Sequence, residues 1–334
     1  MGTTTETMRA VRVHAFGGPE QLLYEEVPRP AAGAGEVLVR VHAAGVNPPD
    51  RYARQGFTNI PEAMRPAWPL PFTPGTDISG VVAALGAGVT GWRVGDEVFG
   101  LVDFPGGRAS AYAEYVVSPA AHLARKPAAL GHVEAAAVPM AGLTAYQFVF
   151  EHLRLGDAQG ATVLVNGAGG GVGHFAVQLA RAAGAAQVVA VASGRHERFL
   201  EDLGADRFVD YTRTAVEDAV REEVDVLIDA VGGPDAHRLL PALRRGGHLA
   251  PVFLGDYAPH RAAALGITVA GWQVRSNGAH LTELARLADT GRLRVGIDTV
   301  FPLHEASDAH LHAERGHLQG KIVLQVAQAP YPDR

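Results

Sequence analysis

The sequence predicts an α/β protein in which a doubly wound parallel sheet is combined with a second domain that is mainly β. Two patterns along the 334 residues support this prediction. Before about residue 126, short apolar or alternating runs are separated by glycine and proline, which is typical of strands and turns. After about residue 130, short apolar runs alternate with segments of helical period, which is typical of β-α units.

The first part of the chain has four segments with the pattern of strands, at residues 10–13, 36–41, 78–83 and 113–117. Residues 88–98 add a short apolar run with turn residues at both ends, as in a compact barrel-like sheet. The proline-rich stretch 61–74 is predicted to be an irregular surface loop.

Residues 162–180 organise the second part, because an apolar run enters a glycine cluster and continues as a helix-period pattern. A strand, a tight turn and a helix in this order let backbone N–H groups approach a phosphate at the positive end of the helix. The G-x-G-x-x-G spacing is met in its looser form, with Ala168 first, then Gly170 and Gly173. A turn that only lets the helix pack closely on the strand is the alternative.

The β-α units that follow have predicted strands at 188–192, 207–210, 224–229, 248–253 and 267–270, and predicted helices at 197–203, 215–222, 234–243 and 279–290. This alternation predicts a Rossmann-type parallel sheet with the glycine turn at its first crossover. Residues 298–301 and 321–326 return to the strand pattern. We therefore predict a β-rich domain of residues 1–126 and 271–334, and a nucleotide-binding domain of residues 127–270.

Composition excludes several classes of function. The net charge of −6 comes without any block of like charge, so neither a nucleic acid nor a membrane is an expected partner. The absence of cysteine excludes disulfides, thiolate zinc sites and a catalytic thiol. The first residues lack the pattern of a signal peptide, and no apolar run of 18 residues is free of charge, so a cytoplasmic location is expected.

Several short motifs follow one another in a specific order along the chain, at residues 44–56, 74–82, 91–98, 113–115, 142–145, 167–173, 203–206 and 320–324. Through them the chain resembles, over nearly its whole length, the medium-chain dehydrogenase/reductase superfamily and within it the zinc-free quinone oxidoreductase group. The resemblance implies a GroES-like catalytic domain, a Rossmann cofactor domain, a C-terminal return to the first domain, and a cofactor between the two.

No metal site is expected. Many members of the superfamily hold zinc through Cys and His, but Gly75, Thr76 and Asp77 stand where they carry Gly-His-Glu. Among the 15 histidines, His310 and His312 form the only close pair, on a segment predicted to be an exposed helix. We interpret them as surface residues, so hydride transfer would proceed without a Lewis acid.

The end of the second strand of the nucleotide domain favours NADPH. NAD-selective folds usually place Asp or Glu there, whereas this chain has Ser193 and Arg195, which suit a 2′-phosphate. The resemblance adds Tyr211 as a further phosphate contact. Alternatively, Arg195 is an ordinary solvated cation at a helix start.

The remaining cofactor contacts are expected around the phosphate turn and the nicotinamide. The turn contributes Ala168, Gly169, Gly170, Gly171 and Val172. The backbone of Phe253 and Leu254 is expected near the carboxamide, at the carboxyl end of a strand. Thr144 resembles the family threonine that reaches nicotinamide and ribose, or else it bonds back to its own helical turn. Lys321 approaches the cofactor from the returning segment, or lies in solvent.

On the substrate side, the resemblance implies that Asn47, Asp50 and Tyr52 line the cleft. Tyr52 is the candidate donor of a proton to a carbonyl oxygen; alternatively it shapes the pocket and water delivers the proton. Asp50 is expected to cap local backbone. Trp68, Phe57 and Phe253 are candidates for an apolar wall.

These expectations predict an NADPH-dependent reductase that transfers hydride to a small-molecule quinone or α,β-unsaturated carbonyl. A biosynthetic enoyl or imine reductase and a non-catalytic NADPH-binding protein are the alternatives. The strand within residues 266–272, if it lies at the sheet edge, invites a second copy, so a homodimer is expected.

Overall fold

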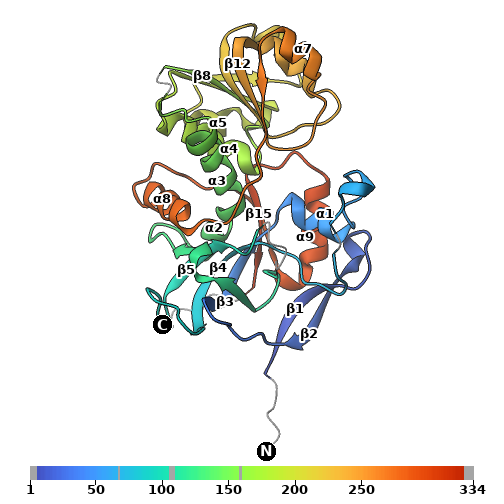
Figure 1. Cartoon of the computed structure of the whole chain (residues 1–334), viewed down its shortest axis with the longest axis vertical. Helices are drawn as coiled ribbons and strands as arrows, with labels where there is room; N and C mark the ends of the chain where they lie inside the picture. Colours follow the sequence, from blue (N-terminus) through green and yellow to red (C-terminus); the bar gives the residue numbers. More distant parts are fainter. Residues whose placement is uncertain (1–5, 67, 105–109, 158–159, 327–334) are drawn as a thin grey trace, which may run out of the picture.

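The computed structural model describes residues 6–66, 68–104, 110–157 and 160–326. The two larger β-sheets lie one above the other in Figure 1. The upper sheet is parallel and the lower one is mixed, which confirms the predicted fold class. Residues 1–5 and 327–334 of the predicted β-rich domain, and Ala67 of the predicted loop, lie outside the described residues.

The lower sheet has seven strands in the order β14-β15-β3-β4-β5-β7, and β6 also pairs with β3. Its members are β3 (Glu36–Gly45), β4 (Asp77–Leu85), β5 (Glu97–Leu101), β6 (Tyr115–Pro119), β7 (Leu123–Arg125), β14 (Ile297–Pro302) and β15 (Lys321–Gln325). The antiparallel pair β1 (Thr7–Val13) and β2 (Leu22–Pro28) packs beside it. The C-terminal strands therefore rejoin the sheet that the N-terminal part begins, as predicted.

The upper sheet has six parallel strands in the order β10-β9-β8-β11-β12-β13. They are β8 (Thr162–Asn166), β9 (Gln187–Ala192), β10 (Arg207–Asp210), β11 (Val224–Asp229), β12 (Leu243–Pro251) and β13 (Thr268–Val269). β13 lies at the edge, as the dimer hypothesis requires, but it has only two residues. The apolar strands are buried on both faces, which parallel sheets in α/β folds require.

The helices surround these two sheets. They are α1 (Pro48–Arg54), α2 (His132–Ala136), α3 (Pro139–Tyr146), α4 (Gly171–Ala182), α5 (Glu197–Asp202), α6 (Val216–Ala219), α7 (Pro259–Ala264), α8 (Gly278–Asp289) and α9 (Ala306–Glu314). A π-helical segment, Gln147–His152, continues α3. None of the helices in the described ranges is long and apolar enough to cross a membrane.

Two predicted helices are shorter or tighter than expected. The segment predicted as 215–222 is helical only at Val216–Ala219, and the one predicted as 234–243 is a 3₁₀ helix at Ala236–Ala242. Pro241 lies inside the latter and has no N–H to donate, which works against a regular α-helix. The described residues of the predicted loop, 61–66 and 68–74, are irregular as predicted, apart from a short 3₁₀ turn at Glu62–Met64 and an isolated bridge from Phe72 to Val13.

Candidate functional site

The turn between β8 and α4 is built so closely that glycine is required. Gly167 has a φ of +73°, which disfavours residues with a side chain. A Cβ atom at Gly173 would lie 2.2 Å from the carbonyl oxygen of Gly167. The first turn of α4 leaves backbone N–H groups without helical partners, and no side chain at Gly171 or Gly173 covers them. The turn therefore fits a phosphate group.

A cleft of about 670 Å³ opens at the carboxyl ends of β8, β9, β10 and β11. Gly169, Gly170, Ser193 and Tyr211, all expected cofactor contacts, line it. The segment before β15 also lines it through His317 and Leu318, and Nδ1 of His317 lies 3.4 Å from the Tyr211 hydroxyl. A cleft in this position is where parallel α/β sheets bind dinucleotides.

Arg213 and Arg195 are placed differently relative to this cleft, which is also lined by Arg238 in its ion pair with Glu217. Arg213, which the sequence interpretation did not single out, lines the cleft together with Tyr211 and Ser193. Arg195 lies outside the lining, and its Nε is 3.1 Å from Nε2 of His196. Residues 212 and 214 also line the cleft, so the whole turn after β10 faces it.

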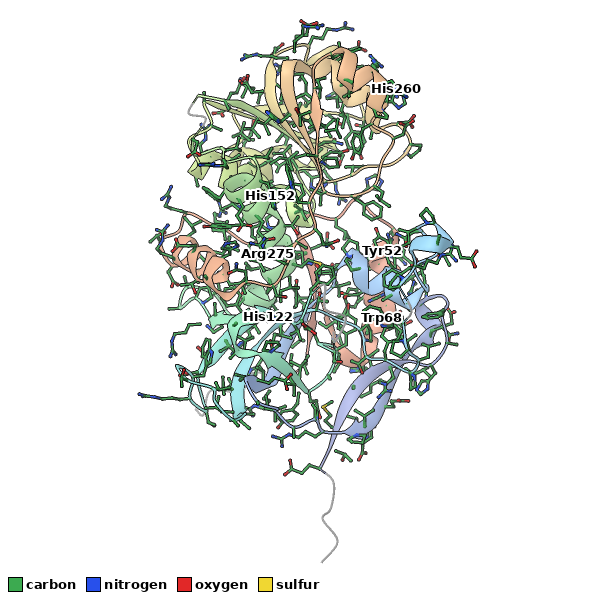
Figure 2. All side chains as sticks on the ribbon, in the orientation of Figure 1. Tyr52, Trp68, His122, His152, His260 and Arg275 are labelled. Carbon is green, nitrogen blue, oxygen red and sulfur yellow. The ribbon has the colours of Figure 1, made fainter. Side chains whose placement is uncertain are left out.

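Apolar side chains are exposed where β11 and β12 end. Val231, Phe253 and Leu254 are 55%, 37% and 56% exposed. The ring of Tyr52 on α1 stacks on Phe253 at a centroid distance of 5.3 Å. This contact joins α1 to the segment that follows β12, on the side of the molecule where Figure 2 labels Tyr52 and Trp68. Trp68 in turn contacts Phe57, at 5.5 Å between ring centroids.

The expected residues Asn47, Asp50 and Lys321 meet in one buried network with Asp77. Asn47 Nδ2 donates to Asp77 Oδ2 at 2.9 Å, and the ammonium of Lys321 donates to Asn47 Oδ1. The Asn47 N–H donates to Asp50 Oδ2 at 2.9 Å, so Asp50 caps the start of α1 as expected. Asp77 Oδ1 accepts from the Met140 N–H at 2.9 Å and so stabilises the start of α3. Lys321 therefore lies neither in solvent nor in the lining of the 670 Å³ cleft.

Burial shifts the titration of this network. It raises the pKa of Asp50 to about 7, against the Asn47 hydrogen bond that lowers it. It raises the pKa of Asp77 to about 6, against the positive charge of Lys321. Burial also lowers the pKa of Lys321, while Asp77 and Asp50 act to raise it. The three groups therefore shift one another's pKa values, and Asp50 keeps its proton to a higher pH than Asp77 does.

Thr144 lies on α3 and is buried. Its hydroxyl donates to the Met140 carbonyl oxygen at 2.7 Å, which is the back-bonded arrangement of a threonine inside a helix. Met140 is also the residue whose N–H binds Asp77. The start of α3, and Thr144 with it, is thus tied to the buried network.

The prediction that His310 and His312 form an exposed pair is wrong for His310. His310 is completely buried, and its Nε2 lies 3.1 Å from the hydroxyl oxygen of Tyr112. That hydroxyl donates to Asp50 Oδ2 at 3.2 Å, which extends the network to α9. His312 instead lies 2.7 Å from Asp298 Oδ2. The small residues Ala306 and Ala309 mark the buried face of α9 and could have indicated where His310 points.

Within the described ranges, no group of three or more His, Cys, Asp or Glu side chains is arranged to hold a metal ion. At the position implied for a metal ligand by the family motif, Thr76 and Asp77 face the amide of Asn47 and the ammonium beside it. An ammonium group at this point opposes the binding of a second cation.

Two family models match the chain. The one described as an alcohol dehydrogenase GroES-like domain covers residues 33–128, and the one described as a zinc-binding dehydrogenase covers residues 203–324. A chloroplast envelope quinone oxidoreductase homolog from Arabidopsis thaliana is 31% identical over 332 residues, which are 95% of this chain and 98% of the relative.

Solved structures are also similar to this chain over nearly its whole length. One titled NAD-dependent alcohol dehydrogenase has a TM-score of 0.85 and 34% identity, covering 96% of this chain and 100% of its own. Mycobacterial Rv1454c complexed with NADPH has a TM-score of 0.83 and 29% identity, with the same coverage of 96% and 100%. The chain is therefore an oxidoreductase with a nicotinamide cofactor, and it belongs to the medium-chain dehydrogenase/reductase superfamily, in its zinc-free quinone oxidoreductase group.

Proposed function

We propose that this oxidoreductase is an NADPH-dependent, zinc-independent reductase that transfers hydride to a quinone or to the β-carbon of an α,β-unsaturated carbonyl. The observation that carries the proposal is the 670 Å³ cleft, which joins the glycine turn to Ser193, Tyr211 and Arg213. An arginine and two hydroxyl groups suit a 2′-phosphate, which a carboxylate after β9 would repel. When bound, NADPH supplies the hydride from C4 of its nicotinamide.

The residues of the chain provide binding, orientation and the proton. The glycine turn and α4 would hold the pyrophosphate, and the ends of β11 and β12 offer exposed apolar side chains to the nicotinamide half. Tyr52, fixed by its stack on Phe253, is the group whose hydroxyl would donate a proton or a hydrogen bond to the carbonyl oxygen of the substrate.

Zinc is implied by the description of one family model, but the residues do not fit it. Around Asp77 the network offers an amide, a hydroxyl, a carboxylate and an ammonium; the histidine of the network, His310, contacts the Tyr112 hydroxyl, and the chain has no cysteine, so the ligand set of a catalytic zinc is not assembled. No step through a metal follows from this arrangement. Elemental analysis of the active protein is expected to find no stoichiometric zinc, and activity should survive dialysis against a chelator.

The function is tested by stopped-flow oxidation of NADPH and NADH with a panel of quinones, enones and cyclic imines. We expect turnover of at least one quinone or enone, with higher kcat/KM for NADPH than for NADH. Turnover of imines alone would replace the proposed substrate class, and no turnover of any member would contradict the proposal. A homodimer through β13 and a cytoplasmic location remain predictions; light scattering in solution tests the first.

A further inference from the structure

Lys321 is one of two lysines in the chain, and it is 4% exposed at the first position of β15. Its ammonium donates to the carbonyl oxygen of Val46 at 2.6 Å and to Oδ1 of Asn47. Both acceptors belong to the turn that leads into α1. The charged end of the side chain is therefore directed at the Val46–Asn47 turn.

The stem of the same side chain lies against the phosphate turn. A Cβ atom at Gly171, the first residue of α4, would be 3.0 Å from Cδ of Lys321. The preceding N–H, that of Gly320, donates to the Gly169 carbonyl oxygen at 2.8 Å. The Lys321 side chain thus links the phosphate turn, residues 167–173, to the start of α1.

The charges of Lys321 and Asp77 fix the amide of Asn47 in one orientation. An ammonium only donates, so it must face Oδ1, and an ionised carboxylate only accepts, so it must face Nδ2. Without the ammonium, Oδ1 would be a buried acceptor with no partner, which costs free energy and allows the amide to turn. Asn47 is the N-cap residue of α1, and α1 carries Tyr52.

We propose that Lys321 is a positioning residue that holds the Val46–Asn47 turn, and hence α1 with Tyr52, in register with the phosphate turn. This inference rests on the proposed function for its kinetic test, but the contacts are independent of it. A ligand of the cofactor phosphates would set the affinity for NADPH, whereas a positioning residue sets the rate of the bound complex. The two roles are therefore separable.

The chain has no cysteine, so Lys321→Cys creates a unique site for chemical rescue. The variant is alkylated with 2-bromoethylamine in denaturant and refolded, which rebuilds a lysine side chain with sulfur in place of one methylene. We expect K321C to lower kcat by about tenfold to a hundredfold, as for small misplacements of reacting groups, with the Kd for NADPH changed by less than about threefold. Aminoethylation should restore most of kcat.

The matched control is Lys126→Cys, treated in the same way. Lys126 donates to the carbonyl oxygens of Pro127 and Leu130, away from the network, so neither the substitution nor the alkylation should change kcat. Wild-type protein taken through the same refolding cycle gives the reference rate. A weaker Kd for NADPH with an unchanged kcat at saturation would overturn the inference, as would a kcat that aminoethylation does not restore.

A second measurement needs no variant of Lys321. In protein with isotope-labelled lysine, only two side-chain ammonium signals exist, and Lys126→Arg identifies them. We expect the Lys321 ammonium protons to exchange slowly with water and its pKa to lie below that of an ordinary lysine, because burial disfavours the charge against the opposing effect of Asp77 and Asp50. Fast exchange with an ordinary pKa would overturn the inference. If wild-type protein oxidises no NADPH, the proposed function fails. The exchange rate and pKa of the Lys321 ammonium still test whether it binds the Val46–Asn47 turn.

Discussion

Arg213 and Arg195 are two candidate contacts for the 2′-phosphate in the proposed use of NADPH, and of these two only Arg213 lies in the lining of the cleft. We predict that Arg213→Ala raises the Kd for NADPH by about tenfold or more, the loss of one charge-assisted hydrogen bond, and changes the Kd for NADH by less than about twofold. Fluorescence titration with both nucleotides measures this. Arg195→Ala is the comparison; a larger selective effect there would assign the phosphate to Arg195, as the sequence alone suggested.

Tyr52 is the second residue whose role a single atom can test. Tyr52→Phe removes the hydroxyl but keeps the ring that stacks on Phe253. We predict that kcat falls by roughly a hundredfold, within the range for loss of a general acid, with KM within about threefold. Steady-state kinetics on the best substrate of the panel measure the change. An unchanged kcat would mean that water delivers the proton.

Single residues also show what the sequence could and could not predict. Asp50 was expected to cap local backbone because Asp side chains in such turns commonly do so, and its hydrogen bond from the Asn47 N–H confirms this. The participation of Asp77 and Tyr112 could not be predicted, because their partners Met140 and His310 are distant in sequence. Burial of a polar side chain depends on such distant partners, and a single sequence does not record them.

The glycine turn allows a prediction at the level of one element. A Cβ at Gly173 would meet backbone atoms of Gly167 and Ala168 at 2.2 and 2.6 Å, whereas a Cβ at Gly170 would meet only Gly167 O, at 3.5 Å. We predict that Gly173→Ala costs about 2 kcal/mol or more of unfolding free energy without cofactor. Gly170→Ala should cost about 1 kcal/mol or less, mainly through the weaker helix cap. If the two variants lose equal unfolding free energy in urea, close backbone packing at Gly173 does not explain why this turn needs glycine.

At the same level, the strands β9, β10 and β11 were more predictable than the helical segments that follow β10 and β11. The apolar runs of β9, β10 and β11 begin and end within a residue of their predicted limits, because a buried parallel strand needs an unbroken apolar run. The helical segments after β10 and β11 depend on how the chain packs on the sheet, which propensity alone does not determine. The short α6 and the 3₁₀ helix around Pro241 are the result.

Stability of the whole molecule should depend on pH through buried histidines. Burial lowers the pKa of His310 to about 3, while the unfolded chain protonates histidine near 6.5. The unfolded state therefore binds more protons below that pH, and stability is lost as the pH falls from about 6.5. We predict that the unfolding free energy of His310→Gln falls less steeply with decreasing pH than that of wild type. The difference between variant and wild type, measured by urea unfolding, should therefore rise as the pH falls from 6.5 to 4.

Asp50 should show the opposite slope, because its pKa is raised to about 7 by burial. The folded state then keeps a proton that the unfolded state loses above about pH 4, so stability falls as the pH rises towards 7. The unfolding free energy of Asp50→Asn, relative to wild type, is therefore expected to rise between pH 4 and 7. Slopes of the same sign for the Asp50 and His310 variants would contradict this assignment of charges.

The position of β15 has a consequence for synthesis of the protein. This strand comes from the final residues that the structure describes, yet it lies between β14 and β3 in the lower sheet. Residues before it also bond the glycine turn. During translation, the parallel sheet can form early, but β3 keeps an open edge at residues 43–45 until β15 leaves the ribosome. A nonsense mutation shortly before Gly320 would thus yield an aggregation-prone chain whose glycine turn lacks its hydrogen bond from the Gly320 N–H.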